Sequence, residues 1–169
     1  VSGFLLSQWS LSEQRGVLRV VSTETPAWWG GGDESESFLT TLRSGGGGLV
    51  QAGRIGGLGK GERVYSVRFA GDVAYVVTFR QVDPLYTVDL SDASRPRILG
   101  ELKIEGYSSY LHPIGDDLLL GVGQDATEQG RPTGTQLSLF DVSDLRQPKR
   151  LDHAPLGPGW SEAESDHHA

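Results

Sequence analysis

Three carboxylates and an imidazole alternate near the end of the sequence. Glu162, Glu164, Asp166 and His168 are separated by single residues. If residues 161–169 form a strand, these side chains share one face at a spacing of roughly 6.5–7 Å. Carboxylate oxygens and imidazole nitrogens suit Ca²⁺, Mn²⁺ or Zn²⁺, so the alternation predicts a candidate divalent-cation site that a second segment would complete. A solvated terminus is the alternative interpretation.

Arg68 and His112 form a second candidate set. In the internal repeat described below they occupy the same position as His168, so we expect all three to face the channel of the fold or one shared surface. A cationic and an ionisable side chain at such a place would bind a ligand. Ordinary buried polar pairing is the alternative.

Trp28 and Trp29 stand directly before Gly30, Gly31 and Gly32. Aromatic side chains on a glycine-rich loop supply a large contact area at a small cost in conformational entropy. The pair therefore predicts a surface that stacks on a sugar ring or on a protein partner. Packing against the rim of the fold is the alternative.

The elements that must position these residues are short strands. Residues 64–69, 74–79 and 85–90 are apolar or alternating runs separated by turn residues. The connectors at 70–72 and 81–84 contain Gly, Asp and Pro, which favour tight turns. The pattern predicts antiparallel hairpins and an all-β fold.

A repeat organises these strands. Residues 85–97 match residues 137–149 at an offset of 52, and both segments carry an Asp-x-Ser-Asp cluster followed by Pro. Offsets of 44 and 56 relate other segments, so the unit is about four strands in 44–56 residues, the size of a propeller blade. We therefore predict a β-propeller fragment of about three four-stranded antiparallel blades plus the first strand of a fourth. The expected blades cover residues 3–58, 64–104 and 109–156, and residues 161–169 begin the next.

The Asp-x-Ser-Asp clusters at residues 89–92 and 141–144 resemble calcium loops only superficially. They lack the Gly and the position-12 Glu of an EF-hand. Asp and Ser shortly before Pro favour Asx turns at the end of a strand. We expect a structural role for both clusters.

Composition excludes several classes of function. The chain has 169 residues, no Cys and a formal net charge of −7. Disulfide frameworks, zinc ribbons and thiol nucleophiles are therefore excluded, and nucleic acid is not an expected partner. No apolar run approaches the roughly 18 residues of a membrane span, and no basic signal-peptide region is present. Membrane contact is expected only through regions outside this chain.

Several segments carry a family resemblance: residues 65–69, 76–86, 106–113, 120–127 and 166–169. They resemble secreted proteins with a C-terminal β-propeller domain that is distantly related to WD repeats. The resemblance implies a bacterial or archaeal protein that is extracellular or part of the cell envelope, and is often membrane-tethered. It implies no reaction and no catalytic residues.

We therefore expect a non-enzymatic module that binds or scaffolds a protein or glycan partner, with no cofactor beyond a divalent cation. The alternative is a metal-dependent hydrolase or lyase at the propeller channel. In that case His112, Asp166 and His168 would act as ligands or acid–base groups, while Arg68 would stabilise an anion. A third alternative places the function on blades outside this sequence. Because three blades leave two open faces, self-association through them is also expected.

Overall fold

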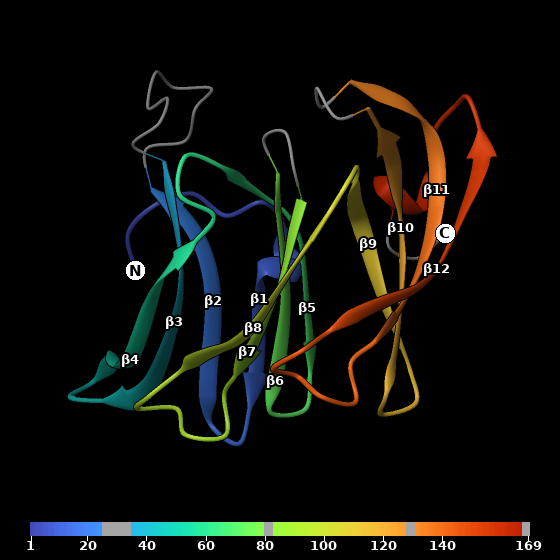
Figure 1. The fold of residues 1–169 in the computed structure, drawn as a ribbon. Coiled ribbons are helices and arrows are strands. Elements are labelled where there is room, and N and C mark those ends of the chain that lie inside the picture. Colours follow the sequence, from blue (N-terminus) through green and yellow to red (C-terminus); the bar gives the residue numbers. More distant parts are fainter. Residues whose placement is uncertain (25–34, 80–82, 128–130, 167–169) are drawn as a thin grey trace.

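The computed structural model describes residues 1–24, 35–79, 83–127 and 131–166, and it confirms the all-β fold. The strands form three four-stranded antiparallel sheets in simple sequential order, and Figure 1 shows the sheets side by side. The first sheet contains β1 (Leu11–Gln14), β2 (Val17–Glu24), β3 (Glu36–Gly45) and β4 (Gly48–Leu58). The second contains β5 (Arg63–Ala70), β6 (Val73–Phe79), β7 (Asp83–Asp89) and β8 (Arg97–Ile104). The third contains β9 (Tyr107–Ile114), β10 (Leu118–Ala126), β11 (Pro132–Asp141) and β12 (Lys149–Gly157).

Two one-turn 3₁₀ helices, η1 (Gln8–Ser10) and η4 (Glu162–Glu164), flank the sheets. The strand expected to begin a fourth blade is not formed in residues 161–166, where η4 stands instead. The cause is a capping box: the Ser161 hydroxyl accepts from the N–H of Ala163, and the Glu164 carboxylate accepts from the N–H of Ser161. No helix among the described residues is long and apolar enough to cross a membrane.

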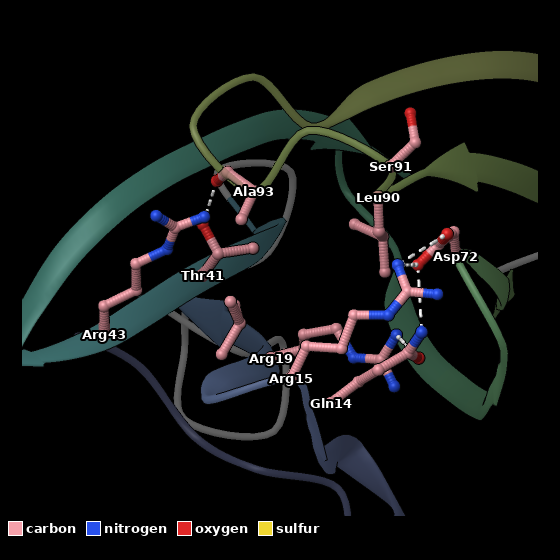
Figure 2. A pocket seen from close by; sticks show the side chains of 10 residues that line it. Gln14, Arg15, Arg19, Thr41, Arg43, Asp72, Leu90, Ser91 and Ala93 are labelled. Atoms are coloured by element: carbon pink, nitrogen blue, oxygen red, sulfur yellow. Dashed lines mark hydrogen bonds and ion pairs between the residues drawn. The ribbon is translucent and has the colours of Figure 1, made fainter.

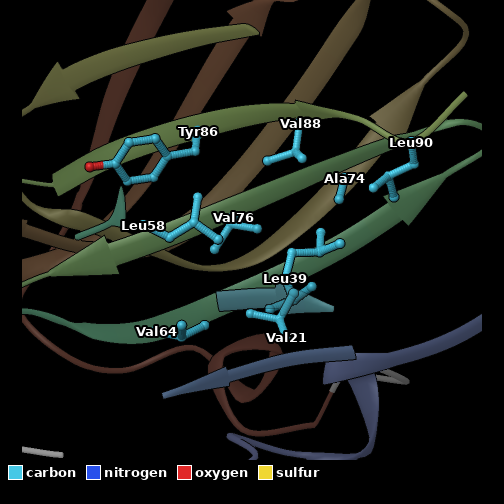
Figure 3. Close-up of a cluster of buried hydrophobic side chains, with 10 residues drawn as sticks. Val21, Leu39, Leu58, Val64, Ala74, Val76, Tyr86, Val88 and Leu90 are labelled. Carbon is cyan, nitrogen blue, oxygen red and sulfur yellow. The ribbon is translucent and has the colours of Figure 1, made fainter. Parts of the chain in front are cut away.

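The second sheet is buried on both faces, which explains the continuous apolar run of β6. Ala74 and Val76 pack in a cluster shared with the first sheet, shown in Figure 3. Tyr75 and Val77 pack in another cluster shared with the third sheet. Because successive side chains of a strand point to opposite faces, a strand between two packed sheets needs apolar residues at every position. These two clusters hold the three sheets together.

The two Asp-x-Ser-Asp clusters form turns of one design, which we call the first latch turn (residues 89–96) and the second latch turn (residues 141–148). In the first, the carboxylate of Asp89 accepts from the N–H of Ser91 at 2.9 Å, and the equivalent bond of the second measures 3.0 Å. Hydrogen bonds from Ser91 hold the pKa of Asp89 below its usual value, and Arg97 adds to the effect. The expected Asx turns are confirmed.

Each latch turn is bound to the sheet before it. Thr41 of β3 donates its hydroxyl hydrogen to the carbonyl oxygen of Ala93 in the first latch turn at 2.5 Å. Thr87 of β7 makes the same contact with the carbonyl oxygen of Leu145 in the second latch turn, also at 2.5 Å. Both threonines are buried. The same side chain therefore joins one sheet to the next at both interfaces.

A glycine opposite each threonine leaves room for the latch turn. Thr41 pairs with Gly53 and Thr87 pairs with Gly100 across neighbouring strands. A Cβ atom on Gly53 would lie 2.7 Å from Pro96. A Cβ on Gly100 would lie 2.5 Å from the carbonyl oxygen of Leu145. Both separations are far shorter than normal contacts, so the latch requires glycine for steric reasons.

Gly100→Ala should lower the free energy of unfolding by about 1–3 kcal/mol, because the added methyl group displaces the second latch turn. Gly48→Ala is the matched control, since nothing lies within 4 Å of a Cβ there. Urea unfolding followed by tryptophan fluorescence measures both variants. Equal effects of the two substitutions would contradict the steric requirement for glycine opposite the latch turn.

Candidate functional site

Arg68 and His112 occupy equivalent strands and the same face of two successive sheets. Arg68 of β5 pairs with Tyr75, whose ring belongs to the cluster between the second and third sheets. Leu111 belongs to the same cluster, so His112 beside it on β9 points away from the second sheet. His112 is exposed, and its Nδ1 lies 2.9 Å from the hydroxyl of Tyr110. Arg68 therefore lies between two sheets and His112 on the outer side of the third sheet, so the structure does not bring the two side chains together.

The alternating acidic face expected near the end of the chain is not formed. Because residues 162–164 are a helical turn, Glu162, Glu164 and Asp166 do not alternate along a strand. The carboxylate of Glu164 accepts from the side-chain amide of Gln124 at 2.7 Å. The described residues contain no group of three or more His, Cys, Asp or Glu side chains placed to hold a metal ion.

Three of the expected site residues, Trp28, Trp29 and His168, lie outside the described residues. The aromatic surface and the complete cation site therefore stay predictions.

A cavity of about 110 Å³ opens between the first and second sheets, beside the first latch turn (Figure 2). We call it the arginine cavity. Its walls come from the β1–β2 and β5–β6 hairpins, from β2 and β3, and from the first latch turn. The lining residues are Gln14, Arg15, Val17, Arg19, Thr41, Arg43, Asp72, Leu90, Ser91 and Ala93. Because Thr41 and Ala93 make the latch contact, the latch also shapes this cavity.

The charges that line the arginine cavity do not balance. Arg15, Arg19 and Arg43 face one acidic side chain in the lining, Asp72, while Glu13 and Asp92 act on Arg19 and Arg43 from outside the lining. Figure 2 shows Arg15 and Arg19 beside Asp72, with Arg43 across the cavity from them. Arg15 is paired with Asp72 at 3.3 Å. This local excess stands out because the chain as a whole carries a net charge of −7.

Arg19 is the buried member of the three, with 5% of its surface exposed. Its guanidinium donates to Gln14 Oε1 at 2.9 Å and to the carbonyl oxygen of Gly71 at 2.6 Å. A third bond of 2.7 Å goes to the hydroxyl of Ser12, and the guanidinium carbon lies 4.9 Å from the centre of the Phe69 ring. All of these partners are neutral, so they satisfy hydrogen bonds without compensating the charge.

Burial lowers the pKa of Arg19, while the nearby charges of Asp72 and Glu13 act in the opposite direction. The guanidinium nevertheless stays protonated, because arginine does not lose its proton in proteins. Its Nε atom is buried and has no hydrogen-bond partner among the described residues. A buried charge with incomplete compensation is costly, and a bound anion would remove that cost.

Arg15 occupies the tip of the β1–β2 hairpin in a backbone conformation that favours glycine. Its φ is 52°, and it is the only non-glycine residue with positive φ in the described part of the chain. The equivalent tip of the β5–β6 hairpin is Gly71, with φ 53°. Arginine at this position therefore adopts a left-handed backbone conformation that is unfavourable for any residue with a Cβ atom.

The second interface contains an equivalent cavity without arginine. This second cavity, of about 360 Å³, lies between the second and third sheets. The matching hairpin registers place Gly71 where Arg15 stands and Tyr75 where Arg19 stands. No arginine or lysine is among its described lining residues, and Asp116 is. Arg68 lies at the same interface beside Tyr75 but is not among the residues that line this cavity, so an equivalent cavity forms here without a cationic side chain in its described lining.

Sequence reasoning did not single out Arg15, Arg19 or Arg43. A signal was present in the repeat, because the offset of 56 residues aligns Arg15 with Gly71 and Arg19 with Tyr75. Cations at positions where the next repeat has none are candidates for function rather than packing. Arg43 comes from a different strand and is brought to the cavity by its pairing with β2.

Comparisons with known proteins give the family but no activity. The profile of a family described as a beta propeller domain matches residues 1–169. An uncharacterized protein of Methanocaldococcus jannaschii is 44% identical over the whole chain, which covers 26% of that protein. An uncharacterized protein of Archaeoglobus fulgidus is 46% identical, also over the whole chain, which covers 25% of it. The chain thus spans about a quarter of these relatives, and their archaeal source does not support a bacterial origin, one of the two origins that the resemblance implies.

Arg15→Gly should raise the free energy of unfolding by about 0.5–1 kcal/mol, because glycine relieves the left-handed backbone and the exposed ion pair with Asp72 contributes little. Arg15→Ala is the control, since it removes the same charge but keeps the unfavourable φ. Urea unfolding compares both with the unchanged chain. If Arg15→Gly were as destabilising as Arg15→Ala, backbone preference would not explain this position.

Proposed function

The chain belongs to the beta propeller domain family, and on that basis we propose that it is a non-enzymatic binding module. In this proposal, the arginine cavity holds an acidic group of a protein or glycan partner. The observation that carries the proposal is the gathering of three arginines around one cavity between the first and second sheets. Arginine suits this role because its planar guanidinium binds oxyanions through two parallel hydrogen bonds.

The comparison between the two interfaces supports a binding role. Both have the same latch and equivalent cavities, but only the first has cations in its lining. Packing alone therefore does not account for a buried Arg19 or for Arg15 at a position that favours glycine. Residues retained at a cost to stability are commonly those that function requires.

The rigid wall of the cavity supports the same role. Thr41 fixes the first latch turn against β3, and both Thr41 and Ala93 of that turn line the cavity. A site whose walls are already in place loses less conformational entropy when a ligand binds. The two sheets joined by the latch contact thus serve as a scaffold for the site.

We place the module outside the cytoplasm, at the cell surface or in the cell envelope, on the strength of the family resemblance alone. Nucleic acid is not proposed as a partner, because no block of basic residues in the sequence is long enough to serve as a phosphate-binding arm. Self-association remains a further prediction. Its basis is exposed apolar side chains on the outer sheets: Leu49, Val50, Leu151 and Leu156.

No observation among the described residues favours the alternative of a metal-dependent hydrolase or lyase. Glu164 is engaged by Gln124, and Arg68 lies between the second and third sheets while His112 points away from the second sheet. His168 is outside the described residues.

The proposal predicts that the chain binds immobilised polyglutamate or dextran sulfate at low ionic strength and does not bind unmodified dextran. Arg43→Gln should weaken this binding about tenfold through loss of a charge-assisted hydrogen bond. Arg146→Gln is the matched control, because Arg146 is an exposed arginine on the second latch turn, away from the arginine cavity. Biolayer interferometry measures all three proteins. Equal losses in both variants, or equal binding to unmodified dextran, would contradict the proposal.

A further inference from the structure

We infer that the acidic group held in the arginine cavity is a tetrahedral oxyanion, phosphate or sulfate. This inference rests on the proposed function and adds the chemical class of the ligand. It depends on the charge, the geometry and the size of the cavity.

The lining of the cavity carries more positive than negative charge. Three arginines stand against Asp72 in the lining, while two carboxylates outside it, Glu13 and Asp92, act on these arginines. Asp72 is itself already engaged, since it accepts from the side-chain amide of Gln14 at 2.9 Å and pairs with Arg15. An anion that enters the cavity therefore meets three guanidinium groups and one carboxylate that is already paired.

The directions of the three arginines also favour a tetrahedral group. Arg15 comes from a hairpin tip, Arg19 from the middle of β2 and Arg43 from the end of β3. Figure 2 shows that they border the cavity from opposite sides. A single guanidinium satisfies a planar carboxylate in the bidentate arrangement. Phosphate and sulfate present oxygens in several directions and make use of donors on more than one wall.

The cavity has room for one small group. Its volume is about 110 Å³, and it opens to the solvent. This space accommodates a phosphate or sulfate group. A glycan or protein partner would insert its esterified group, with the remainder lying outside the cavity.

Arg19 gives the site its deepest cation. It is nine-tenths buried or more, and its Nε atom lacks a hydrogen-bond partner among the described residues. Its remaining contacts are to neutral oxygens of Gln14, Ser12 and Gly71. A dianion beside this guanidinium would supply the compensating charge that the chain itself does not bring into contact.

The test is isothermal titration calorimetry of the full chain with inorganic phosphate, sulfate and acetate at low ionic strength. We expect one phosphate or sulfate per chain, bound at least about tenfold more tightly than acetate, a difference of roughly 1.4 kcal/mol. Arg43→Gln and Arg15→Gly should each weaken phosphate binding about tenfold. Arg146→Gln should leave it unchanged. Both cavity substitutions affect exposed residues, so loss of folding does not confuse the result.

The outcomes separate this inference from the proposed function. Acetate binding as tightly as phosphate, with loss in Arg43→Gln, would overturn the tetrahedral class while leaving an acidic-group site intact. Absence of binding by all three anions, together with no effect of the cavity substitutions on polymer binding, would overturn both.

Glucose 6-phosphate and glucose 6-sulfate identify the source of the oxyanion. Binding of these esters as tightly as the inorganic anions supports an esterified partner. Binding of the inorganic anions alone supports a free anion. In either case the tetrahedral class stands.

Discussion

The structure depends on one repeated contact between neighbouring sheets. A buried threonine hydroxyl donates to a backbone carbonyl of the next latch turn, and a glycine opposite it leaves space for that turn. The contact fixes how far each sheet stands from the next, because neither the turn nor the glycine strand can move closer. Thr41 therefore does more than join the first two sheets, since it also sets the width of the arginine cavity that it lines.

The arginine cavity and the second cavity show how one scaffold carries different surfaces. The latch and the apolar clusters are common to both interfaces, so they account for the stability of the stack. The residues at the lining positions differ between the two cavities. At the first interface they include arginines, which lower the stability of the fold. Arg19 gives up hydration, and Arg15 adopts a backbone conformation that suits glycine. An anionic ligand explains both costs with one cause.

Much of the fold was predictable from local pattern. The repeated clusters that begin at Asp89 and Asp141 predicted the turns, and the apolar runs predicted strands of the second sheet. The helical turn at 162–164 was also predictable from the sequence, because Ser161 followed by Glu164 is a capping-box pattern. This pattern favours a helical turn, whereas the alternation of acidic residues favours a strand. The arginine cavity was harder to foresee, since it assembles from strands paired by register and from a turn bound across the interface. That contact joins residues far apart in the sequence, and only the offset of 56 residues, which aligns Arg15 with Gly71 and Arg19 with Tyr75, indicates the site.

A crystal structure of the chain soaked with selenate, a tetrahedral dianion located by its anomalous scattering, tests whether the arginine cavity binds such an ion. We expect one strong anomalous peak bordered by Arg15, Arg19 and Arg43, and none in the second cavity. An empty arginine cavity beside selenate bound elsewhere on the surface, or equal occupancy of both cavities, would contradict this expectation.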